Sequence, residues 1–250
     1  EWGIILSEIQ AHHDPTLGPE EYAVRLREVE VWRATGTGSE AIAAQVSRTV
    51  DAHAWRLLGY RETEALVEQL KKTHASLIRE LFPGRFSLTS LRVILRNLLR
   101  EGLPIRDLPA ILELLLEFRG HSQDPDQLTE FVRSGFAHYL CAKFSDAQGV
   151  LHALILEPSA EQAVLSGLRE SSAALWLDLD LDTSLRILTS AARGVTRAAE
   201  EKTPVVVLCS PRPRRFLRRL MEPSFPSLPV MAYSEVAPLT EVRTFGLIGT

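Results

Sequence analysis

The spacing of apolar residues in the first third of the chain predicts one strand followed by two helices. Apolar and polar residues alternate over 22–31, as in a half-buried strand, and the slip in this alternation at Glu28 predicts a β-bulge. After a short Gly-containing link, Ser39 is a favoured N-cap, and the apolar residues then follow the helical period as far as Gly59. A second helix is expected to run from there to Pro83, so the pair predicts a helical hairpin.

The middle of the chain, residues 86–143, is predicted to be a compact helical block. Leucines recur at the helical spacing over 88–99, and a glycine and a proline follow where that helix should end. Asp107 is placed to cap the next helix. Pro125 suits the first turn of a third helix, whose apolar face is expected to reach Tyr139.

The last third alternates apolar, β-branched runs with helical segments. Asp182 is expected to cap a helix that runs to about Glu201. The strand–helix–strand succession predicts a βαβ-type unit with a buried central strand. The fold class is therefore α+β or α/β, with a helical middle block and a C-terminal βαβ-type subdomain. The expected strands are 150–156, 205–209, 230–233 and 242–248.

Composition narrows the class of protein without revealing its function. Apolar residues make up 45% of the chain and charged residues 24%, which is ordinary for a globular protein. The net charge of −4 gives no global attraction to nucleic acid or anionic lipid. Two cysteines, Cys141 and Cys209, form neither a disulfide framework nor a four-ligand zinc site, which favours a reducing, cytosolic compartment.

The sequence carries no sign of membrane insertion or secretion. No stretch approaches 18 uncharged apolar residues, as a membrane-spanning helix requires. The first residues contain no basic segment followed by a cleavage site, so they are not a signal peptide. Because they also lack an initiating Met, we expect the chain to be a fragment of a longer protein.

No set of residues predicts catalysis, a cofactor or a metal site. The phosphate loop and the dinucleotide fingerprint are both missing. Ser210 follows a strand without the G-x-S-x-G pattern, so a hydrolase that uses Ser210 or Cys209 is a minor alternative. The acidic residues of 178–182 lack the Gly and Glu of a calcium loop, and His12-His13 lies in a loop where solvation is the simpler interpretation.

Arg212–Arg219 is the one dense basic segment, with five arginines in eight residues. Phosphate contacts by this segment would make the protein a nucleic-acid-binding regulator. The simpler interpretation is an amphipathic helix with Phe216, Leu217 and Leu220 inward and the arginines solvated or paired with acids.

Four segments of the chain resemble one known family. "SLTSLRVILRNLLREGLPIRDLPAILELL" (87–115) resembles the core signature of the type III secretion export gate family (FlhA/SctV), shared by the bacterial flagellum and the injectisome. Asp124–Cys141, Pro204–Val236 and Leu17–Val31 are similar to further segments of that family, in the same order and at similar spacing. The resemblance covers nearly the whole chain.

The resemblance implies a cytosolic region of four subdomains behind a membrane region that is absent here. Subdomain one would cover 1–48 with a return at 83–102, and the helical insert 49–82 would be subdomain two. Subdomain three, mainly helical, would cover 103–182, and the α/β subdomain four 183–250. One departure is that only Trp32–Gly38 separates the first strand from the next helix. Either this member is trimmed there or a segment is missing, which leaves the completeness of the first sheet open.

The resemblance also implies a function without catalysis. Such regions form a nine-membered homomeric ring below the export pore, at the cytoplasmic face of the bacterial inner membrane. The ring receives chaperone–substrate complexes and contacts gatekeeper proteins, substrate-switching proteins and the stalk of the export ATPase. Nucleic acid is not among the implied partners.

The family's chaperone-docking cleft lies between subdomains one and two, and the resemblance places it at Leu58 and Thr89. The family often has an aromatic residue at the first of these positions, so Leu58 would give a shallower pocket. Trp55, one helical turn earlier, is expected to supply the aromatic surface. The alternative is core packing for Leu58 and Trp55 and a helix-start role for Thr89.

Subdomain three is expected to contact subdomain one of the next copy in the ring. A ring requires two different patches that fit each other. Exposed arginines beside acidic residues of the helical block would offer complementary charge. The expected interface residues are Arg106, Arg119 and Arg133 with Glu113, Glu117 and Glu130.

Overall fold

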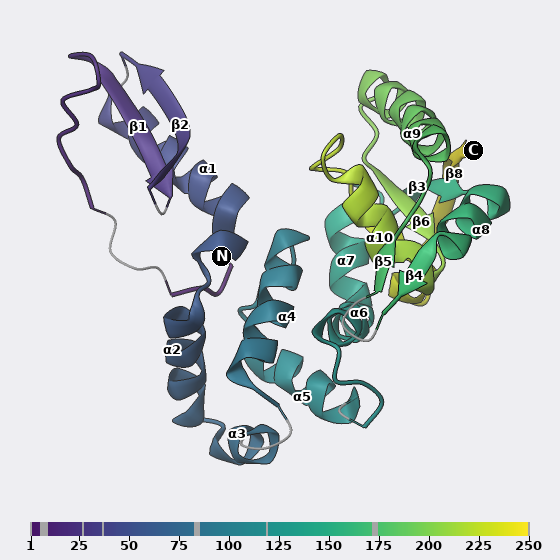
Figure 1. The fold of residues 1–250 in the computed structure, drawn as a ribbon, viewed down its shortest axis with the longest axis horizontal. Coiled ribbons are helices and arrows are strands. Elements are labelled where there is room, and N and C mark those ends of the chain that lie inside the picture. Colours follow the sequence, from purple (N-terminus) through teal and green to yellow (C-terminus); the bar gives the residue numbers. More distant parts are fainter. Residues whose placement is uncertain are drawn as a thin grey trace. The chain divides into compact units, whose positions relative to one another are not determined.

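The computed structural model describes residues 2–5, 10–26, 28–36, 38–82, 86–118, 120–171 and 175–249. The chain divides into two compact units, Glu1–Thr129 and Glu130–Thr250. Helices and strands are mixed, as the apolar pattern predicts (Figure 1). In the described parts, no helix combines the length and the apolar character needed to cross a membrane.

Unit 1 begins with a β-hairpin, so the expected single strand over 22–31 was wrong. Strands β1 (Glu21–Leu26) and β2 (Val29–Thr35) pair antiparallel, and they make up the whole of this two-stranded sheet. Glu28 has φ of +66°, a left-handed turn conformation, so the chain reverses there. The bulge lies instead between Val24 and Arg25. The apolar–polar alternation was misleading because two half-buried strands joined by a very short turn give the same sequence pattern as a single strand with a β-bulge.

Three helices follow where the sequence predicts two. The predicted second helix ends early because the N–H groups of Thr73 and His74 both bond to the Leu70 carbonyl and close the last turn. The N-cap of the first helix is Gly38 rather than Ser39. The helices are α1 (Ser39–Leu57), α2 (Tyr60–Lys71) and α3 (Ala75–Leu81).

Two helices with leucine periodicity supply much of the core of unit 1, as predicted. In α4 (Leu88–Arg100), Ser87 caps the first turn by accepting from the Ser90 N–H. In α5 (Leu108–Phe118), Asp107 accepts from the Ala110 N–H at 3.2 Å. Each buried leucine or isoleucine stabilises the unit by about 1.5–3 kcal/mol. Those buried in α4 are Leu91, Ile94, Leu95, Leu98 and Leu99, and α1 and α2 both pack against this helix.

The chain enters unit 2 through α6 (Pro125–Gly135), which starts at the proline as predicted. The expected continuation to Tyr139 was wrong, because the helix is interrupted at Phe136 and a separate helix, α7 (Ala137–Phe144), follows. Tyr139 is 40% exposed on this second helix.

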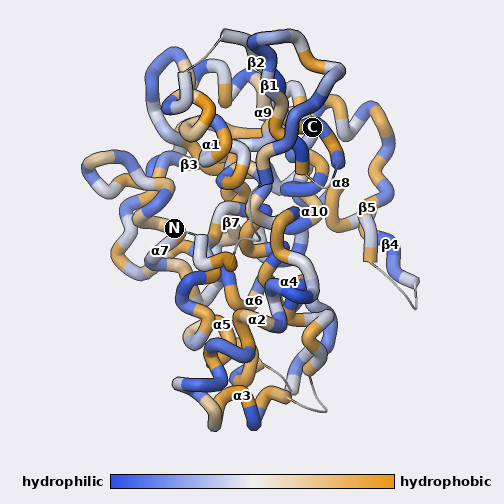
Figure 2. The backbone as a smooth tube through the Cα atoms, turned by 90° about the vertical axis from the view of Figure 1, so that its left-hand side faces the viewer, coloured by the Kyte–Doolittle hydropathy of each residue, from blue (hydrophilic) through white to orange (hydrophobic). Residues whose placement is uncertain are grey.

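Unit 2 is built on a parallel four-stranded sheet of order β7-β6-β3-β8. The strands are β3 (Leu151–Leu156), β6 (Val205–Cys209), β7 (Val230–Ala232) and β8 (Val242–Ile248). The expected βαβ-type unit is confirmed, since β6 and β7 are parallel neighbours joined through α10 (Pro211–Met221). The central strands β3 and β6 are rich in apolar residues and mostly buried, as strands covered on both faces should be. Elsewhere along the backbone, hydrophobic and hydrophilic stretches alternate (Figure 2).

The remaining elements of unit 2 surround this sheet (Figure 1). Asp180, not Asp182, caps the long helix, since its carboxylate accepts from the Thr183 N–H at 2.9 Å. The sheet joins β3 to strands beyond residue 183, so it runs across the expected boundary between subdomains three and four. The elements are α8 (Pro158–Ser166), the hairpin β4 (Leu168–Glu170) and β5 (Leu175–Leu177), α9 (Leu181–Glu200), and the 3-10 turn η1 (Tyr233–Glu235).

Candidate functional site

The three predicted docking residues lie on α1 and α4, which pack against each other, but their exposures differ. Trp55, in the last turn of α1, is half-buried. Leu58, the residue that ends this helix, is 0% exposed. Thr89, in the first turn of α4, is exposed. Only Trp55 and Thr89 therefore offer surface to a partner in this structure, while the burial of Leu58 fits the core-packing alternative.

Trp55 makes cation–π contacts with two arginines of α4. The guanidinium carbons of Arg96 and Arg100 lie 5.4 and 5.1 Å from the centroid of the Trp55 ring. The Arg96 Nε also donates to the Trp55 carbonyl oxygen at 3.0 Å. Each such cation–π contact contributes about 0.5–1 kcal/mol at a partly exposed site. These contacts fix the indole at the α1–α4 junction.

The arginines of α4 were not among the predicted site residues, although their spacing gives a signal for them. Arg92, Arg96 and Arg100 recur every four residues, so they share one face of the helix. We call these three residues the arginine stripe. The leucine periodicity of the same segment is the stronger pattern, and it reports only the buried face.

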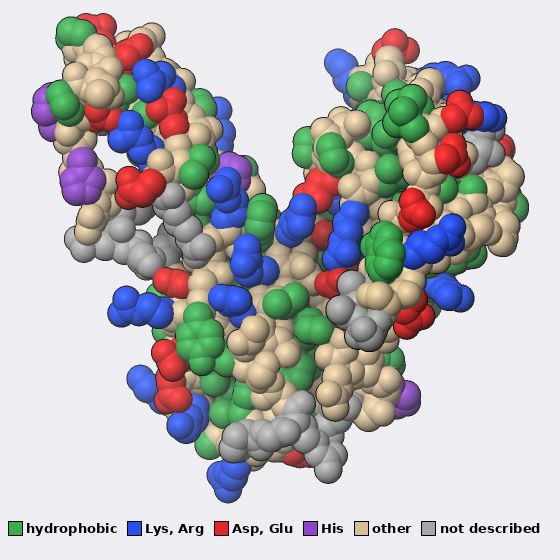
Figure 3. Space-filling view, in the orientation of Figure 1, with side chains coloured by type: hydrophobic (Ala, Val, Ile, Leu, Met, Phe, Trp, Pro, Cys, Tyr) green, Lys and Arg blue, Asp and Glu red, His purple; other side chains and the backbone are tan. Residues whose placement is uncertain are grey.

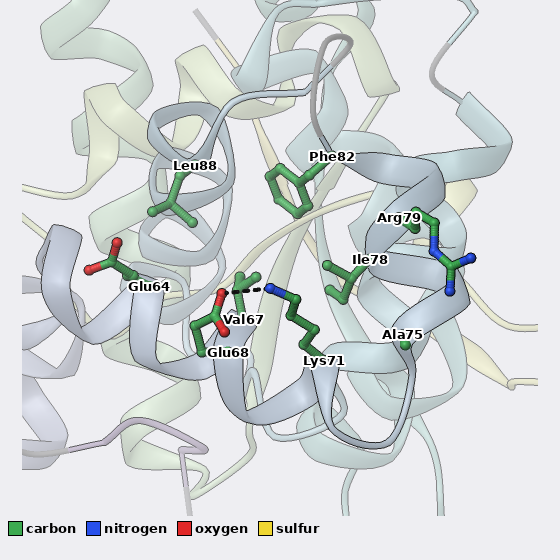
Figure 4. Close-up of a pocket in the computed structure, with 9 residues that line it drawn as sticks. All are labelled: Glu64, Val67, Glu68, Lys71, Ala75, Ile78, Arg79, Phe82 and Leu88. Carbon is green, nitrogen blue, oxygen red and sulfur yellow. Dashed lines mark hydrogen bonds and ion pairs between the residues drawn. The ribbon is translucent and has the colours of Figure 1, made fainter.

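A groove lies between α2, α3 and the start of α4, and its volume is about 540 Å³. Its apolar lining comes from Val67, Ile78, Phe82 and Leu88, whose side chains converge in Figure 4. Charged side chains also line it, and Lys71 pairs with Glu68 at 3.4 Å. The full lining is Glu64, Val67, Glu68, Lys71, Ala75, Ile78, Arg79, Phe82 and Leu88. The groove arises where the predicted single helix divides into two, so the sequence did not indicate it.

Two of the expected ring-interface residues are not free surface charges. Arg133 is only 2% exposed, so the expectation that it is exposed was wrong. Glu130 is partly buried and forms an ion pair with Arg214. The expectation failed because helical spacing places Arg133 on a face of α6 but does not show what covers that face. Arg106, Glu113 and Glu117 are exposed, and Arg119 lies outside the described residues.

Arg133 and Glu130 belong to a buried network inside unit 2. The Arg133 Nε lies 2.6 Å from Glu235 Oε1, and its Nη2 lies 3.0 Å from Oε2. Glu235 Oε2 also accepts from the Ala232 N–H at 3.0 Å. Arg214 donates through Nε and Nη2 to Glu130, and its Nη1 donates to the Val230 carbonyl at 3.1 Å. This ion-pair network (Arg133, Glu235, Arg214 and Glu130) ties α6, α10 and the end of β7 together.

The dense basic segment is largely internal. Arg214, Arg215 and Arg218 are buried, at 0%, 9% and 7% exposure. Arg218 donates to three backbone carbonyls after α10, those of Phe225, Pro226 and Leu228. Exposed arginines remain only at positions 212 and 219 of this segment. A phosphate backbone would therefore meet few of the charges on which the nucleic-acid alternative depends.

The geometry offers no support for a hydrolase built on Ser210 or Cys209. Burial raises the pKa of the Cys209 thiol, so the nucleophilic thiolate is strongly disfavoured. The Ser210 N–H donates to Glu161 at 3.2 Å. Asp180, in the acidic run, is used as a helix cap, and the Thr183 backbone N–H holds its pKa below the ordinary value. The described residues contain no group of three or more metal-ligating side chains.

Comparisons with known proteins agree on one family. Residues 34–241 match the FHIPEP family. The chain is 29% identical over 210 residues to the flagellar biosynthesis protein FlhA of Bacillus subtilis, which covers 84% of this chain and 31% of that protein. It thus spans about a third of the length of such relatives.

Two solved structures show the same fold. CdsV of Chlamydia pneumoniae has a TM-score of 0.84 at 25% identity, covering 94% of this chain and 81% of that one. CdsV has also been solved in complex with CdsO. The nonameric EPEC SctV-C has a TM-score of 0.75 at 22% identity, covering 96% of this chain and 76% of that one.

Proposed function

Because this chain belongs to the FHIPEP family of type III secretion export gate proteins, we propose that it forms a docking ring that receives chaperone-bound substrates and orders their export. The ring would lie at the cytoplasmic face of the bacterial inner membrane, below the membrane region of the full-length protein. The nonameric state of EPEC SctV-C supports a nine-membered assembly, and the complex of CdsV with CdsO supports contact with other export components.

The observation that carries the docking proposal is the position of Trp55. Its half-buried indole is fixed by Arg96 and Arg100 and lies on the same pair of helices as the exposed Thr89. A rigid aromatic side chain with polar neighbours is typical of residues that dominate binding energy. The apolar groove at the start of α4, where Leu88 lines it and Thr89 follows, would add contact area for a helix or an extended segment of the partner.

The remaining partners and the division of the chain follow from the same family assignment. We expect gatekeeper proteins, substrate-switching proteins and the stalk of the export ATPase to contact the ring. The four subdomains would be 1–48 with 83–102, then 49–82, 103–182 and 183–250. The protein would bind chaperone-bound substrates and order their export, without catalysing a reaction.

Replacing Trp55 with alanine is expected to weaken binding of the cognate chaperone–cargo complex about 30-fold, because a central aromatic anchor contributes about 2 kcal/mol or more. Affinity is measured by calorimetry with the purified chaperone–cargo complex. Trp176→Ala is the matched control, since Trp176 is 46% exposed in unit 2. Unchanged affinity in a folded Trp55→Ala variant would remove Trp55 from the docking site.

Reversing two exposed charges of α5 is expected to prevent ring formation. Glu113→Lys and Glu117→Lys together should turn attraction into repulsion if α5 faces a basic patch on the next copy. Protein tethered at high density to a lipid monolayer is imaged by negative stain, and the unaltered chain should show ninefold rings. Rings of unchanged number in the double variant would place the interface elsewhere, and tethered protein without any rings would contradict the proposed assembly.

A further inference from the structure

We propose that a second copy of this chain packs the first turns of its α9 against the exposed face of β8, so that neighbouring copies also touch through unit 2. This inference rests on the proposed function, because it adds a contact between copies of the same ring. The surfaces that would meet are the α9 leucine pair (Leu181 and Leu185) and the β8 apolar surface (Leu239, Val242 and Leu247).

The α9 leucine pair is exposed although α9 is one of the helices that cover the sheet. Leu181 and Leu185 are 74% and 51% exposed, and their four-residue spacing places them on one side of the helix. The buried side of α9 is formed by residues such as Ile187 and Ala191, which belong to the core of unit 2. Hydrophobic side chains are visible at the surface over α9 (Figure 3). The leucine pair thus adds an apolar surface that the core of unit 2 does not use.

The β8 apolar surface includes two side chains on the sheet face opposite α9. In the parallel pairing of β8 with β3, Val242 lies beside Leu151. Leu247 lies beside Ile155, which shares a face of β3 with Leu151. The core under α9 uses the other face, which includes Leu154. Because β8 is an edge strand, its own part of this opposite face is open, and both of its apolar side chains are exposed.

Leu239, in the turn that leads into β8, supplies an independent observation. Its side chain is fully exposed, and its φ of +68° lies in the left-handed region. The Thr240 N–H bonds to the Ala237 carbonyl at 3.1 Å and closes a turn in which a third residue with positive φ is normally glycine. A leucine is unfavourable there, and its side chain adds nothing to the core. Contact with another molecule would account for both properties.

The edge of β8 is poorly suited to pairing with an added strand. A bulge interrupts its register between Ala153 and Leu154 of β3. Arg197 of α9 donates to the Phe245 carbonyl oxygen, so this acceptor of β8 is already used. Bulges and charged side chains of this kind protect sheet edges from strand addition. A partner would therefore contact the exposed side chains, and a helix is an element that commonly covers a sheet face.

The two surfaces fit each other better than they fit a freely diffusing partner. Each offers roughly a few hundred Å², whereas a stable complex buries about 1,200 Å² or more. A contact of this size requires copies that are already held together, because a high effective concentration then compensates for weak affinity. Since α9 and the exposed face of β8 lie on opposite sides of the sheet, the two surfaces cannot meet within one copy. A head-to-tail contact between successive copies of a ring joins them.

Crosslinking of cysteine variants tests the contact on the full chain, tethered at high density to lipid vesicles. The native Cys141 and Cys209 are buried, so the unaltered chain should not react with a short bismaleimide. The double variant Leu185→Cys/Leu247→Cys should give a ladder of dimers, trimers and larger species on a denaturing gel. Arg193→Cys/Leu247→Cys places the first cysteine at an exposed position on another side of α9, and it should give at least tenfold less crosslinked product.

The single variants test the head-to-tail direction of the contact. Leu185→Cys and Leu247→Cys should each stay uncrosslinked alone, and a mixture of the two should stop at dimers. Crosslinking of either single variant with itself would indicate a two-fold contact and overturn the inference.

Leu239→Gly, added to the double variant, should reduce the ladder at least threefold without lowering the melting temperature, because glycine suits the turn. A lower melting temperature would show that Leu239 serves folding, and it would overturn the part assigned to Leu239 in the contact.

Three outcomes separate this contact from the proposed function. If the tethered protein forms ninefold rings in negative stain and the double variant gives no ladder, the inference fails and the ring stands. If the ladder forms without rings, the ring fails and the contact between copies stands. If the purified chaperone–cargo complex abolishes the ladder while rings persist, these surfaces bind that partner, and the inference fails.

Discussion

Replacing Glu235 with alanine is expected to lower the free energy of unfolding of unit 2 by about 3–5 kcal/mol. Glu235 is 1% exposed, and both of its carboxylate oxygens bond to Arg133, which is 2% exposed. Removing the carboxylate leaves the Arg133 guanidinium buried without its counter-charge. The free-energy cost of burying an unpaired charge is larger than the cost of losing an ion pair at the surface. The Ala232 N–H loses its acceptor as well.

Urea denaturation of the full chain, followed by hydrogen exchange of the β6 amides, measures this effect in unit 2. The double variant Arg133→Met/Glu235→Leu should recover most of the lost stability, because apolar replacement of a whole buried pair is often neutral or favourable. Glu241→Ala is the control, since Glu241 pairs with Arg243 at the surface and should change stability by no more than about 0.5 kcal/mol. A Glu235→Ala variant as stable as this control would show that the pair is not stabilising the unit.

Replacing Leu58 with alanine is expected to lower the free energy of unfolding of unit 1 by about 2–5 kcal/mol, because the side chain is fully buried and its removal leaves a cavity. Leu58 is the C-cap residue of α1, and Gly59 is the N-cap residue of α2. A cavity at Leu58 therefore weakens the packing where these two helices meet. A charged residue at position 58 would be more damaging still, because the charge would be buried without a partner. Loss of docking in such a variant would therefore report unfolding.

Thermal melts and chaperone–cargo binding, measured on the same samples, separate the two roles of this region. Leu58→Met keeps the volume and should cost less than about 1.5 kcal/mol while leaving docking intact. Trp55→Ala should show the opposite behaviour, with weaker docking and a smaller change in stability. If Leu58→Ala kept its stability and lost docking, Leu58 would be a contact residue after all.

Part of the proposed docking site follows from the sequence. The resemblance placed it at the end of α1 and the start of α4, and the position of Trp55 one turn before Leu58 predicted an aromatic surface there. The arginine stripe was visible as spacing but was masked by the stronger leucine pattern of the same helix. The groove could not be predicted, because it depends on the backbone bonds at Thr73 and His74 that divide α2 from α3.

The sequence by itself determined the order of most helices and strands, because side-chain periodicity, caps and β-branched runs act over a few residues. It also determined the family, through a motif that is continuous in the chain. Only the tertiary structure decided which charges face solvent. Arg133 meets Glu235 across 102 positions, and Arg214 meets Glu130 across 84, so no local pattern reveals either pair. Burial is a property of what packs over a residue, and for these arginines the covering elements lie far away in the sequence.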